Sequence, residues 1–162
     1  MEKKLFSMIC LLVAMVLLGG CATLEERTAR AAAQAAKVKT AIAERNYKID
    51  VDRMVPLRGT PRHVSSYSVE VRNDSLFSYL PYFGRAYNVP YGGGKGLHFS
   101  ERIGSYREVQ KGDGQWLIII GVANEEDTYQ YTIELFDNGS SSIQVQSRER
   151  EYITYSGQME LE

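Results

Sequence analysis

The chain has 162 residues, of which 24% are charged, and its formal net charge is −1. Removing a leader that ends before Cys21 leaves 142 residues with 17 basic and 19 acidic side chains, which lack the basic surplus that nucleic-acid binding requires. The leader takes Cys10 with it, so Cys21 is then the sole thiol, which excludes a disulfide or a cysteine metal cluster. A domain of this length can bury a hydrophobic core of its own.

The first 21 residues have the order of a secretory signal. Lys3 and Lys4 precede an uncharged run of 14 residues, Leu5 to Leu18, which is shorter than the ~20 residues that span a bilayer. The ending Leu18-Gly19-Gly20-Cys21 resembles a bacterial lipobox and predicts that residues 1–20 are removed and that Cys21 carries fatty acids such as palmitate. The alternatives are an ordinary signal peptide or an N-terminal membrane anchor.

Lipidation of Cys21 predicts a cell-envelope location. Several acyl chains hold a protein on a membrane essentially permanently, because each buried methylene contributes about 0.8 kcal/mol. Ala22 follows the cysteine, whereas an aspartate there is the inner-membrane retention signal of enterobacteria, so the outer membrane is favoured. No acidic cluster follows Cys21 immediately, which favours the periplasmic face over the cell surface.

Residues 21–46 are predicted to form a lipidated N-terminus and a helical tether. Thr23 and Glu26 have the spacing of a capping box, so we expect a helix from about Leu24 to Arg45. Residues at spacings of three and four place a narrow stripe on one of its faces: Leu24, Thr28, Ala31, Ala35, Val38 and Ile42. Either the last turns dock on the domain that follows or the helix pairs with a coiled-coil partner, although Ala and Thr are weak residues for such a seam.

After Asn46 the apolar residues recur with a period of two, which predicts strands. The run Trp116 to Val122 is continuously apolar, as in a central strand that is covered on both sides. Asp137-Asn138-Gly139 predicts a hairpin, because Asn and Gly both tolerate positive φ. The other predicted strands lie at 47–51, 66–72, 96–100, 106–109, 129–135, 143–145 and 152–157, the last of them after the charged turn Arg148–Glu151.

These short turns leave no room for the helices that connect parallel strands, so the sheet is predicted to be antiparallel. The expected fold is α+β and mainly β: one N-terminal helix followed by a curved antiparallel meander of seven to nine strands over residues 47–162. The pattern does not distinguish an open half-barrel from a closed barrel or a sandwich.

The segment Tyr79-Leu80-Pro81-Tyr82-Phe83-Gly84-Arg85-Ala86-Tyr87 is the most distinctive in the chain, and it is followed by Pro90-Tyr91-Gly92, Gly96 and Phe99. It resembles the signature of a Bacteroidota lipoprotein family described as domain of unknown function 4251. The resemblance extends over about 110 residues, from Tyr47 to Gly157. It implies an envelope location and a single domain, and it implies no activity.

Aromatic residues in this segment are the candidate ligand-binding site. Tyrosine combines a broad apolar face with a hydroxyl, and an arginine beside it can contact an anion or a carbonyl group. One interpretation is an aromatic groove wall with Arg85 at its rim. The other is a structural corner, in which tyrosine hydroxyls bind loop carbonyls and Arg85 pairs with a carboxylate. The candidate residues are Tyr79, Tyr82, Phe83, Arg85, Tyr87 and Tyr91.

Other chemistries have weaker support in the sequence. Gly92-Gly93-Gly94-Lys95-Gly96 lacks the spacing and the Ser or Thr of a phosphate loop, and a flexible loop is expected instead. His63 and His98 belong to no metal-ligand motif, and we expect His98 to be a half-buried or outward-facing strand residue. The sequence has no Gly-x-Ser-x-Gly elbow, and the acids at 125–127 are expected to be solvated in a hairpin loop. No metal or cofactor is expected.

The sequence therefore predicts a non-catalytic, lipid-anchored envelope protein whose tyrosine-lined surface binds a hydrophobic or glycan-like ligand or a partner protein. Two alternatives remain open: a structural envelope scaffold that acts through protein contacts, and a hydrolase without a recognisable motif.

Overall fold

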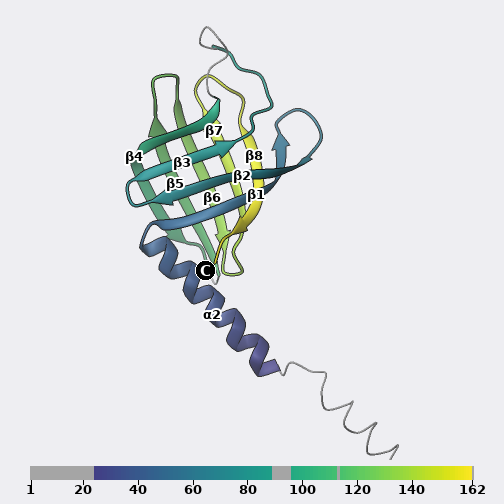
Figure 1. Ribbon diagram of the computed structural model, residues 1–162, viewed down its shortest axis with the longest axis vertical. Coiled ribbons are helices and arrows are strands. Elements are labelled where there is room, and N and C mark those ends of the chain that lie inside the picture. The colour runs from purple at the N-terminus through teal and green to yellow at the C-terminus, as the bar shows by residue number, and fades with distance from the viewer. Residues whose placement is uncertain (1–23, 89–95, 113, 162) are drawn as a thin grey trace, which may run out of the picture. The chain divides into compact units, whose positions relative to one another are not determined.

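The structure is a computed structural model that describes residues 24–88, 96–112 and 114–161 (Figure 1). The chain divides into two compact units, residues 1–32 and 33–162, and the described part of the first is the helical segment 24–32. None of the helices in the described ranges is long and apolar enough to cross a membrane. The elements are the helix α2 (Leu24–Ala43) and the strands β1 (Asn46–Pro56), β2 (Arg62–Arg72), β3 (Ser75–Leu80), β4 (Leu97–Gln110), β5 (Gln115–Ala123), β6 (Thr128–Phe136), β7 (Ser140–Ser147) and β8 (Ile153–Met159).

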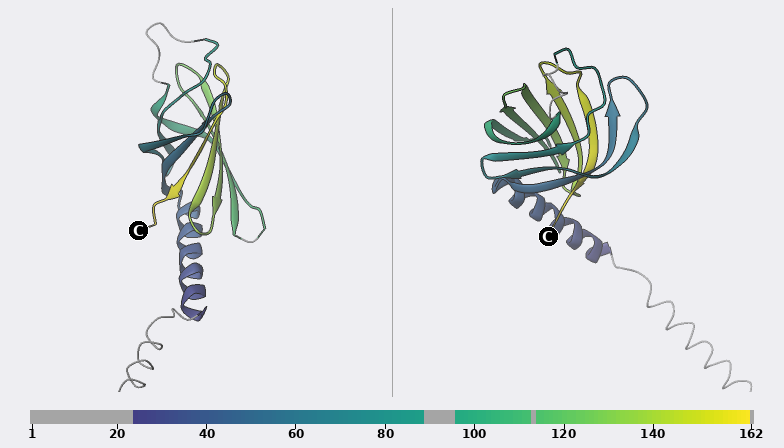
Figure 2. Two further views of the ribbon diagram at one scale, coloured as in Figure 1. Left: turned by 90° about the vertical axis from the view of Figure 1, so that its right-hand side faces the viewer. Right: turned by 45° about the horizontal axis from the view of Figure 1, so that its top comes forward.

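The strands form a closed antiparallel barrel in chain order, and β8 pairs with β1 to complete it. The predicted antiparallel meander is therefore confirmed, and of the three arrangements left open the barrel is the one observed. Strands β1–β3 cross in front of β5–β7 at a steep angle, and the side view separates these two walls (Figures 1 and 2). The β1–β8 seam is tight: a Cβ on Gly157 would overlap the backbone oxygen of Asp50, so this position requires glycine.

Inward-facing side chains fill the barrel. In β6 and β7 every second residue is buried, which produces the period of two seen in the sequence. Strand β5 follows the same alternation: Trp116, Ile118 and Ile120 are buried, whereas Leu117 and Ile119 are partly exposed on the outside. The prediction that this apolar run is covered on both sides is therefore wrong, because the outer wall of a barrel faces solvent.

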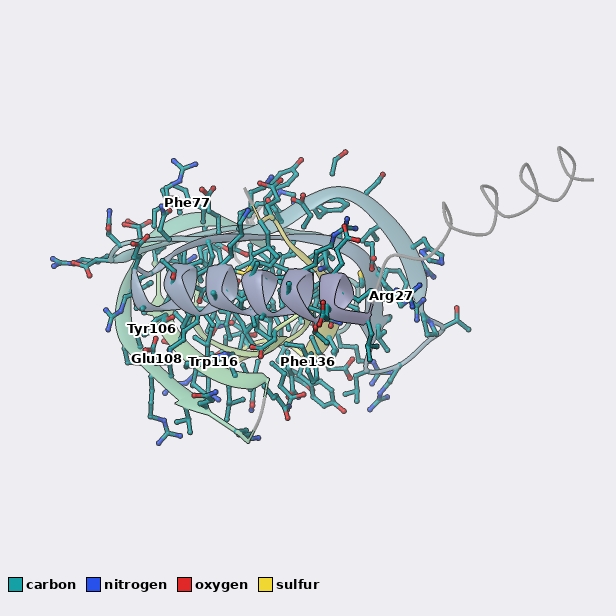
Figure 3. All side chains as sticks on the ribbon, turned by 90° about the horizontal axis from the view of Figure 1, so that it is seen from below. Arg27, Phe77, Tyr106, Glu108, Trp116 and Phe136 are labelled. Atoms are coloured by element: carbon teal, nitrogen blue, oxygen red, sulfur yellow. The ribbon has the colours of Figure 1, made fainter. Side chains whose placement is uncertain are left out.

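The last turns of α2 contribute Val38 and Ile42 to the core, and both side chains are fully buried. Two residues, Glu44 and Arg45, lead from the helix into β1. At this lower end of the barrel the Tyr47 and Tyr106 hydroxyls lie 3.3 Å apart. Seen from below, Tyr106 and Trp116 lie on one side of the barrel and Phe77 on the other (Figure 3).

Three details differ from the predicted strands. The segments predicted at 96–100 and 106–109 are one strand, β4, whose register shifts between Ile103 and Ser105. Strand β3 was not predicted, because its inward positions include Ser78 and its outward positions include Phe77. The Asn138-Gly139 hairpin is confirmed, but only Gly139 has positive φ (79°), while the Asn138 side-chain oxygen accepts a hydrogen bond from the Ser140 amide.

Candidate functional site

The upper rim is the end of the barrel opposite the point where α2 leads into β1, and we define it as residues 57–61, 81–88, 124–127 and 148–152. These segments connect strands that end on the same side of an antiparallel meander, so the topology alone brings them together. Contacts between segments confirm this. The Arg58 Nε lies 3.3 Å from a Glu151 carboxylate oxygen, and the Arg62 guanidinium lies 4.2 Å from the centre of the Phe83 ring.

Buried tyrosines below the rim hold both ends of the connection between β3 and β4. The Tyr155 hydroxyl donates to the Pro81 carbonyl at 2.7 Å, and the Tyr129 hydroxyl donates to the Gly96 carbonyl at 3.4 Å. Burial raises the pKa of both tyrosines, because the low-dielectric interior disfavours the phenolate. Their hydroxyls therefore remain donors to the two carbonyls at physiological pH.

Tyr131 reaches the start of β4 indirectly, through the Ser78 hydroxyl. Its hydroxyl donates to the Ser78 hydroxyl at 2.8 Å, which donates in turn to the Leu97 carbonyl at 2.8 Å. Phe99 packs against Tyr131 edge-on, with ring centres 6.4 Å apart. The polar Ser78 that obscured β3 in the sequence thus has a partner for its hydroxyl inside the barrel.

The segment from Tyr82 to Tyr87 runs antiparallel to residues 149–151 at the rim. The Tyr82 hydroxyl donates to the carbonyls of Arg85 (2.8 Å) and Glu151 (3.1 Å), and the Glu151 amide donates back to Arg85 at 3.0 Å. Burial, followed by the charge of Glu151, raises the pKa of Tyr82. The Tyr87 amide donates to the Glu149 carbonyl at 2.7 Å. Tyr82 therefore has the structural role considered for this segment, in which a tyrosine hydroxyl binds loop carbonyls at a corner of the chain.

Two charged residues of the predicted turn at 148–151 are buried. The Glu151 carboxylate accepts a hydrogen bond from the Arg85 amide at 3.2 Å, in addition to its contact with Arg58. Arg150 lies 3.8 Å from a Glu126 carboxylate oxygen and 5.4 Å from the centre of the Tyr82 ring. Buried charges require partners, and here each charge has one that fixes two rim segments to each other.

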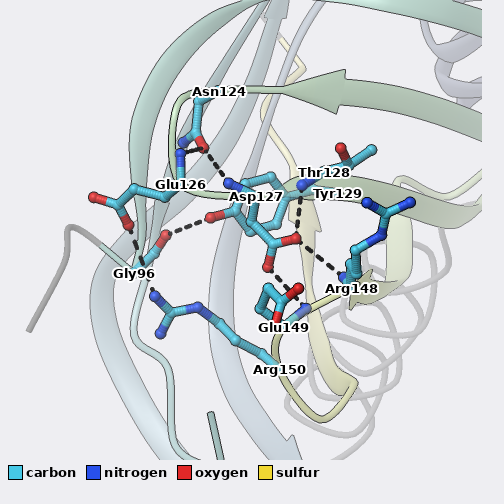
Figure 4. Close-up of polar contacts among 9 residues, drawn as sticks. All are labelled: Gly96, Asn124, Glu126, Asp127, Thr128, Tyr129, Arg148, Glu149 and Arg150. Carbon is cyan, nitrogen blue, oxygen red and sulfur yellow. Dashed lines mark hydrogen bonds and ion pairs between the residues drawn. The ribbon is translucent and has the colours of Figure 1, made fainter. Parts of the chain in front are cut away.

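Asp127 joins the β5–β6 hairpin to the same turn (Figure 4). Its carboxylate accepts hydrogen bonds from the backbone amides of Thr128 (2.7 Å), Arg148 (3.1 Å) and Glu149 (3.1 Å). The expectation that residues 125–127 are simply solvated is therefore wrong for Asp127, and also for Glu126, which pairs with Arg150. Sequence reasoning missed this network because the partner residues lie about 20 positions away, with no local signal to connect them.

Apolar side chains remain exposed around these internal contacts. Phe83 is 47% exposed and Tyr87 is 70% exposed, and Leu57 and Tyr152 on neighbouring rim segments are also exposed. Tyr79 lies nearby on the outer face of β3, where its ring stacks on Tyr67 of β2 with the ring centres 5.4 Å apart, and packs in a tilted arrangement against His98 of β4 with the centres 4.4 Å apart. The outward position of His98 confirms the prediction for that residue.

The predicted site residues therefore separate into groups. Phe83 and Tyr87 expose their rings at the rim, and Tyr79 exposes its ring on the adjoining wall. The Tyr82 hydroxyl is bound to the backbone carbonyls of Arg85 and Glu151. Arg85 binds Glu151 through its main chain, while its side chain is exposed and makes no ion pair within the described residues. Cys21, Tyr91 and residues 92–95 lie outside the described residues.

A groove of about 760 Å³ lies at the other end of the barrel, between the last turns of α2 and strands β1 and β2. Four of its charged residues form ion pairs: Lys48 pairs with Glu160, and Arg72 pairs with Glu70. Sequence reasoning did not predict this groove, because it depends on how the helix docks. Across the described ranges no group of three His, Cys, Asp or Glu side chains is arranged to hold a metal ion.

Comparison with known proteins gives a family and a fold. A search of curated proteins finds no match. A similar solved structure is the crystal structure of a DUF4251 family protein from Bacteroides eggerthii DSM 20697, with a TM-score of 0.61 and 12% sequence identity, covering 78% of this chain and 87% of that chain. The family model described as Domain of unknown function (DUF4251) matches residues 29–159. The chain therefore belongs to the DUF4251 family, as the resemblance in its aromatic segment predicted.

Proposed function

We propose that this protein is a lipid-anchored, non-catalytic binding module of the cell envelope, and that the upper rim of its barrel holds the ligand. The single observation that carries this proposal is the concentration of exposed apolar side chains there. Leu57, Phe83, Tyr87 and Tyr152 belong to three different rim segments that the fold brings to one end. Exposed apolar groups gathered in one place are typical of interaction surfaces.

Some rim residues hold the loops in place while others expose their side chains, and this arrangement supports binding. The carboxylates of Asp127 and Glu151 are occupied by backbone amides and by Arg58, so they hold the loops in place. The exposed rings of Phe83 and Tyr87 then sit on a fixed backbone, which lowers the entropy lost when a ligand binds. The exposed side chain of Arg85 adds a planar cation that can donate hydrogen bonds to a carbonyl or an anion.

Native mass spectrometry of protein purified from a bacterial periplasm tests the proposal. Wild-type protein is expected to carry a reproducible added mass that vanishes on denaturation, and Phe83→Ala is expected to lose it. Phe77→Ala is the matched control, because Phe77 on β3 also has an arginine, Arg72, over its ring, at 5.1 Å, but lies outside the rim. A bare mass for wild type, or equal loss in both variants, contradicts a binding site at the rim.

The lipid anchor has a separate test. Cys21→Ser is expected to abolish incorporation of radiolabelled palmitate and to release the protein from the outer-membrane fraction, because stable attachment requires the acyl chains. Ala22→Ser, which leaves the cysteine in place, is the control. Unchanged labelling of the Cys21→Ser protein contradicts lipidation at this residue.

A further inference from the structure

The outer face of β6, β7 and β8 has an unusual composition, and we call its outward positions the β6–β8 wall. These strands are neighbours in the barrel (Figure 1). Register places their side chains in rows: Thr132 is opposite Gln144, which is opposite Thr154, and in the next row Glu134, Ser142 and Ser156 are aligned. The outward positions are Thr128, Gln130, Thr132, Glu134, Phe136, Ser140, Ser142, Gln144, Gln146, Thr154, Ser156 and Gln158.

One of these twelve positions, Glu134, is charged, although 24% of the residues in the whole chain are charged. Surfaces of small soluble domains usually carry charge at about a quarter to a third of their positions. Other strands of the same barrel are highly charged: β1 alone carries Lys48, Asp50, Asp52 and Arg53. The β6–β8 wall is therefore a neutral face on a charged molecule.

The central polar groups of the wall are available for binding. Within the described residues, the side-chain amides of Gln130, Gln144 and Gln146 make no hydrogen bond to protein, and neither do the hydroxyls of Thr132 and Thr154. Each amide has two donor hydrogens and one acceptor oxygen, and each hydroxyl is both donor and acceptor. The wall thus offers a grid of uncharged donors and acceptors, and its one charged side chain, Glu134, lies 4.0 Å from the Lys111 ammonium group.

Aromatic rings stand at both ends of this grid. Phe136 ends β6 and is 39% exposed, and Tyr152 directly precedes β8 and is 41% exposed. Phe136 lies six positions after Gln130 in the same strand, which corresponds to about 20 Å at 3.3 Å per residue. A ligand that contacts both ends is therefore elongated.

We propose that the β6–β8 wall binds a neutral polysaccharide. Such a polymer presents hydroxyls that donate and accept along its length, which matches the amide and hydroxyl grid, and apolar ring faces that stack on exposed aromatic rings. The near absence of cationic side chains on the wall disfavours nucleic acids, anionic lipid headgroups and acidic glycans as occupants. The centre of a protein interface is typically rich in aromatic and arginine side chains and poor in serine, which the centre of this wall does not match.

Affinity electrophoresis of the full-length chain tests this proposal. The gels contain one of three soluble neutral polysaccharides (a β-glucan, a mannan or a xylan) or the anionic polysaccharide alginate. Wild-type protein is expected to be retarded by at least one neutral polymer and not by alginate. The variant Thr132→Ala/Gln144→Ala, which removes one hydroxyl and one amide from the central row, is expected to bind at least about fivefold more weakly.

The matched control is Ser100→Ala/Gln110→Ala, which removes the same two kinds of group from exposed positions on β4, away from the wall. It is expected to bind like wild type. The rim variant Phe83→Ala is also expected to bind like wild type, because Phe83 is not part of the wall; Tyr152, which belongs to the rim and also ends the wall, is therefore not used for this comparison. Circular dichroism confirms that each variant is folded. Three outcomes would overturn the proposal: no retardation by any neutral polymer, equal weakening in both double variants, or a concentration-dependent dimer that the wall variant abolishes.

Discussion

Asp127 shows how a single carboxylate can fix the geometry of the rim. It accepts three backbone hydrogen bonds, two of them from Arg148 and Glu149 in a distant turn. Asp127→Asn removes the charge and replaces one acceptor with a donor, so we expect the free energy of unfolding to fall by about 1–3 kcal/mol. Urea denaturation measures this loss. The same change at the exposed Asp52 of β1 should alter stability by less than about 0.5 kcal/mol, and equal effects at both positions would refute the assigned role.

Tyr155 provides a second test at the scale of one residue. Tyr155→Phe removes the hydroxyl that donates to the Pro81 carbonyl and leaves that carbonyl without its partner. We expect a loss of about 1–3 kcal/mol in the free energy of unfolding. Tyr152→Phe is the control, because Tyr152 is exposed and makes no hydrogen bond through its hydroxyl in the described residues. If the two variants were equally stable, the hydroxyl would not be holding the β3–β4 connection.

At the scale of elements, the sequence pattern predicted the extent of the helix α2 and its buried residues, but it did not predict the surface against which the helix packs. Its capping residues and alanine content predicted its length to within two residues of the observed Leu24–Ala43. The stripe included Val38 and Ile42, the two residues that are buried. The stripe alone could not distinguish docking on the barrel from docking on another helix, because both bury the same small residues.

Ile42→Ala tests whether the last turns of α2 are part of the folded core. The side chain is fully buried, so its truncation should leave a cavity and lower the free energy of unfolding by about 2–5 kcal/mol. Lys39→Ala, at an exposed position of the same helix, keeps helix propensity and should be nearly neutral. Guanidinium denaturation of both variants compares them, and a neutral Ile42→Ala would mean that the helix end does not contribute to the core.

Among the strands, too, some could be predicted from local alternation and one depends on a contact across the barrel. Alternation in β6, β7 and β8 was visible in the sequence, because their inward residues are mostly aliphatic or aromatic. Strand β3 was hidden, because its inward Ser78 is polar and satisfied by Tyr131, a contact across the barrel that no local pattern records. The candidate site was predicted in part for a related reason: the exposed rings could be named from the sequence, but the charges that hold the rim come together only in the closed barrel.

At the scale of the whole molecule, the buried tyrosines predict a specific response to alkaline pH. Burial raises the pKa of Tyr47, Tyr131 and Tyr155 above the ordinary value of 10.0. Above pH 10 the unfolded chain releases these protons more readily than the folded chain, so the stability they contribute below pH 10 is lost as pH rises. Urea midpoints measured from pH 8 to 11 should therefore fall above pH 10. A flat profile would contradict the burial of these hydroxyls.

Closure of the barrel is the feature that gives the molecule two distinct ends. Antiparallel pairing in chain order places the connections 57–61, 124–127 and 148–152 at one end, while the last turns of α2 contribute to the core before the chain enters β1. Local patterns predicted every strand except β3, but they did not predict this closure, because the pairing of β1 with β8 joins segments about 100 residues apart. The exposed rings of Phe83 and Tyr87 occupy the rim that results, and the proposed function rests on that placement.

Site-specific photocrosslinking in the native cell envelope tests the central claim most directly. A photoreactive amino acid replaces Tyr87, which is 70% exposed at the rim, or Arg107, which is exposed on β4. The proposed function predicts a discrete crosslinked product from position 87 that is absent from position 107 and absent without illumination. The same products from both positions, or none from position 87, would contradict a binding site at the rim.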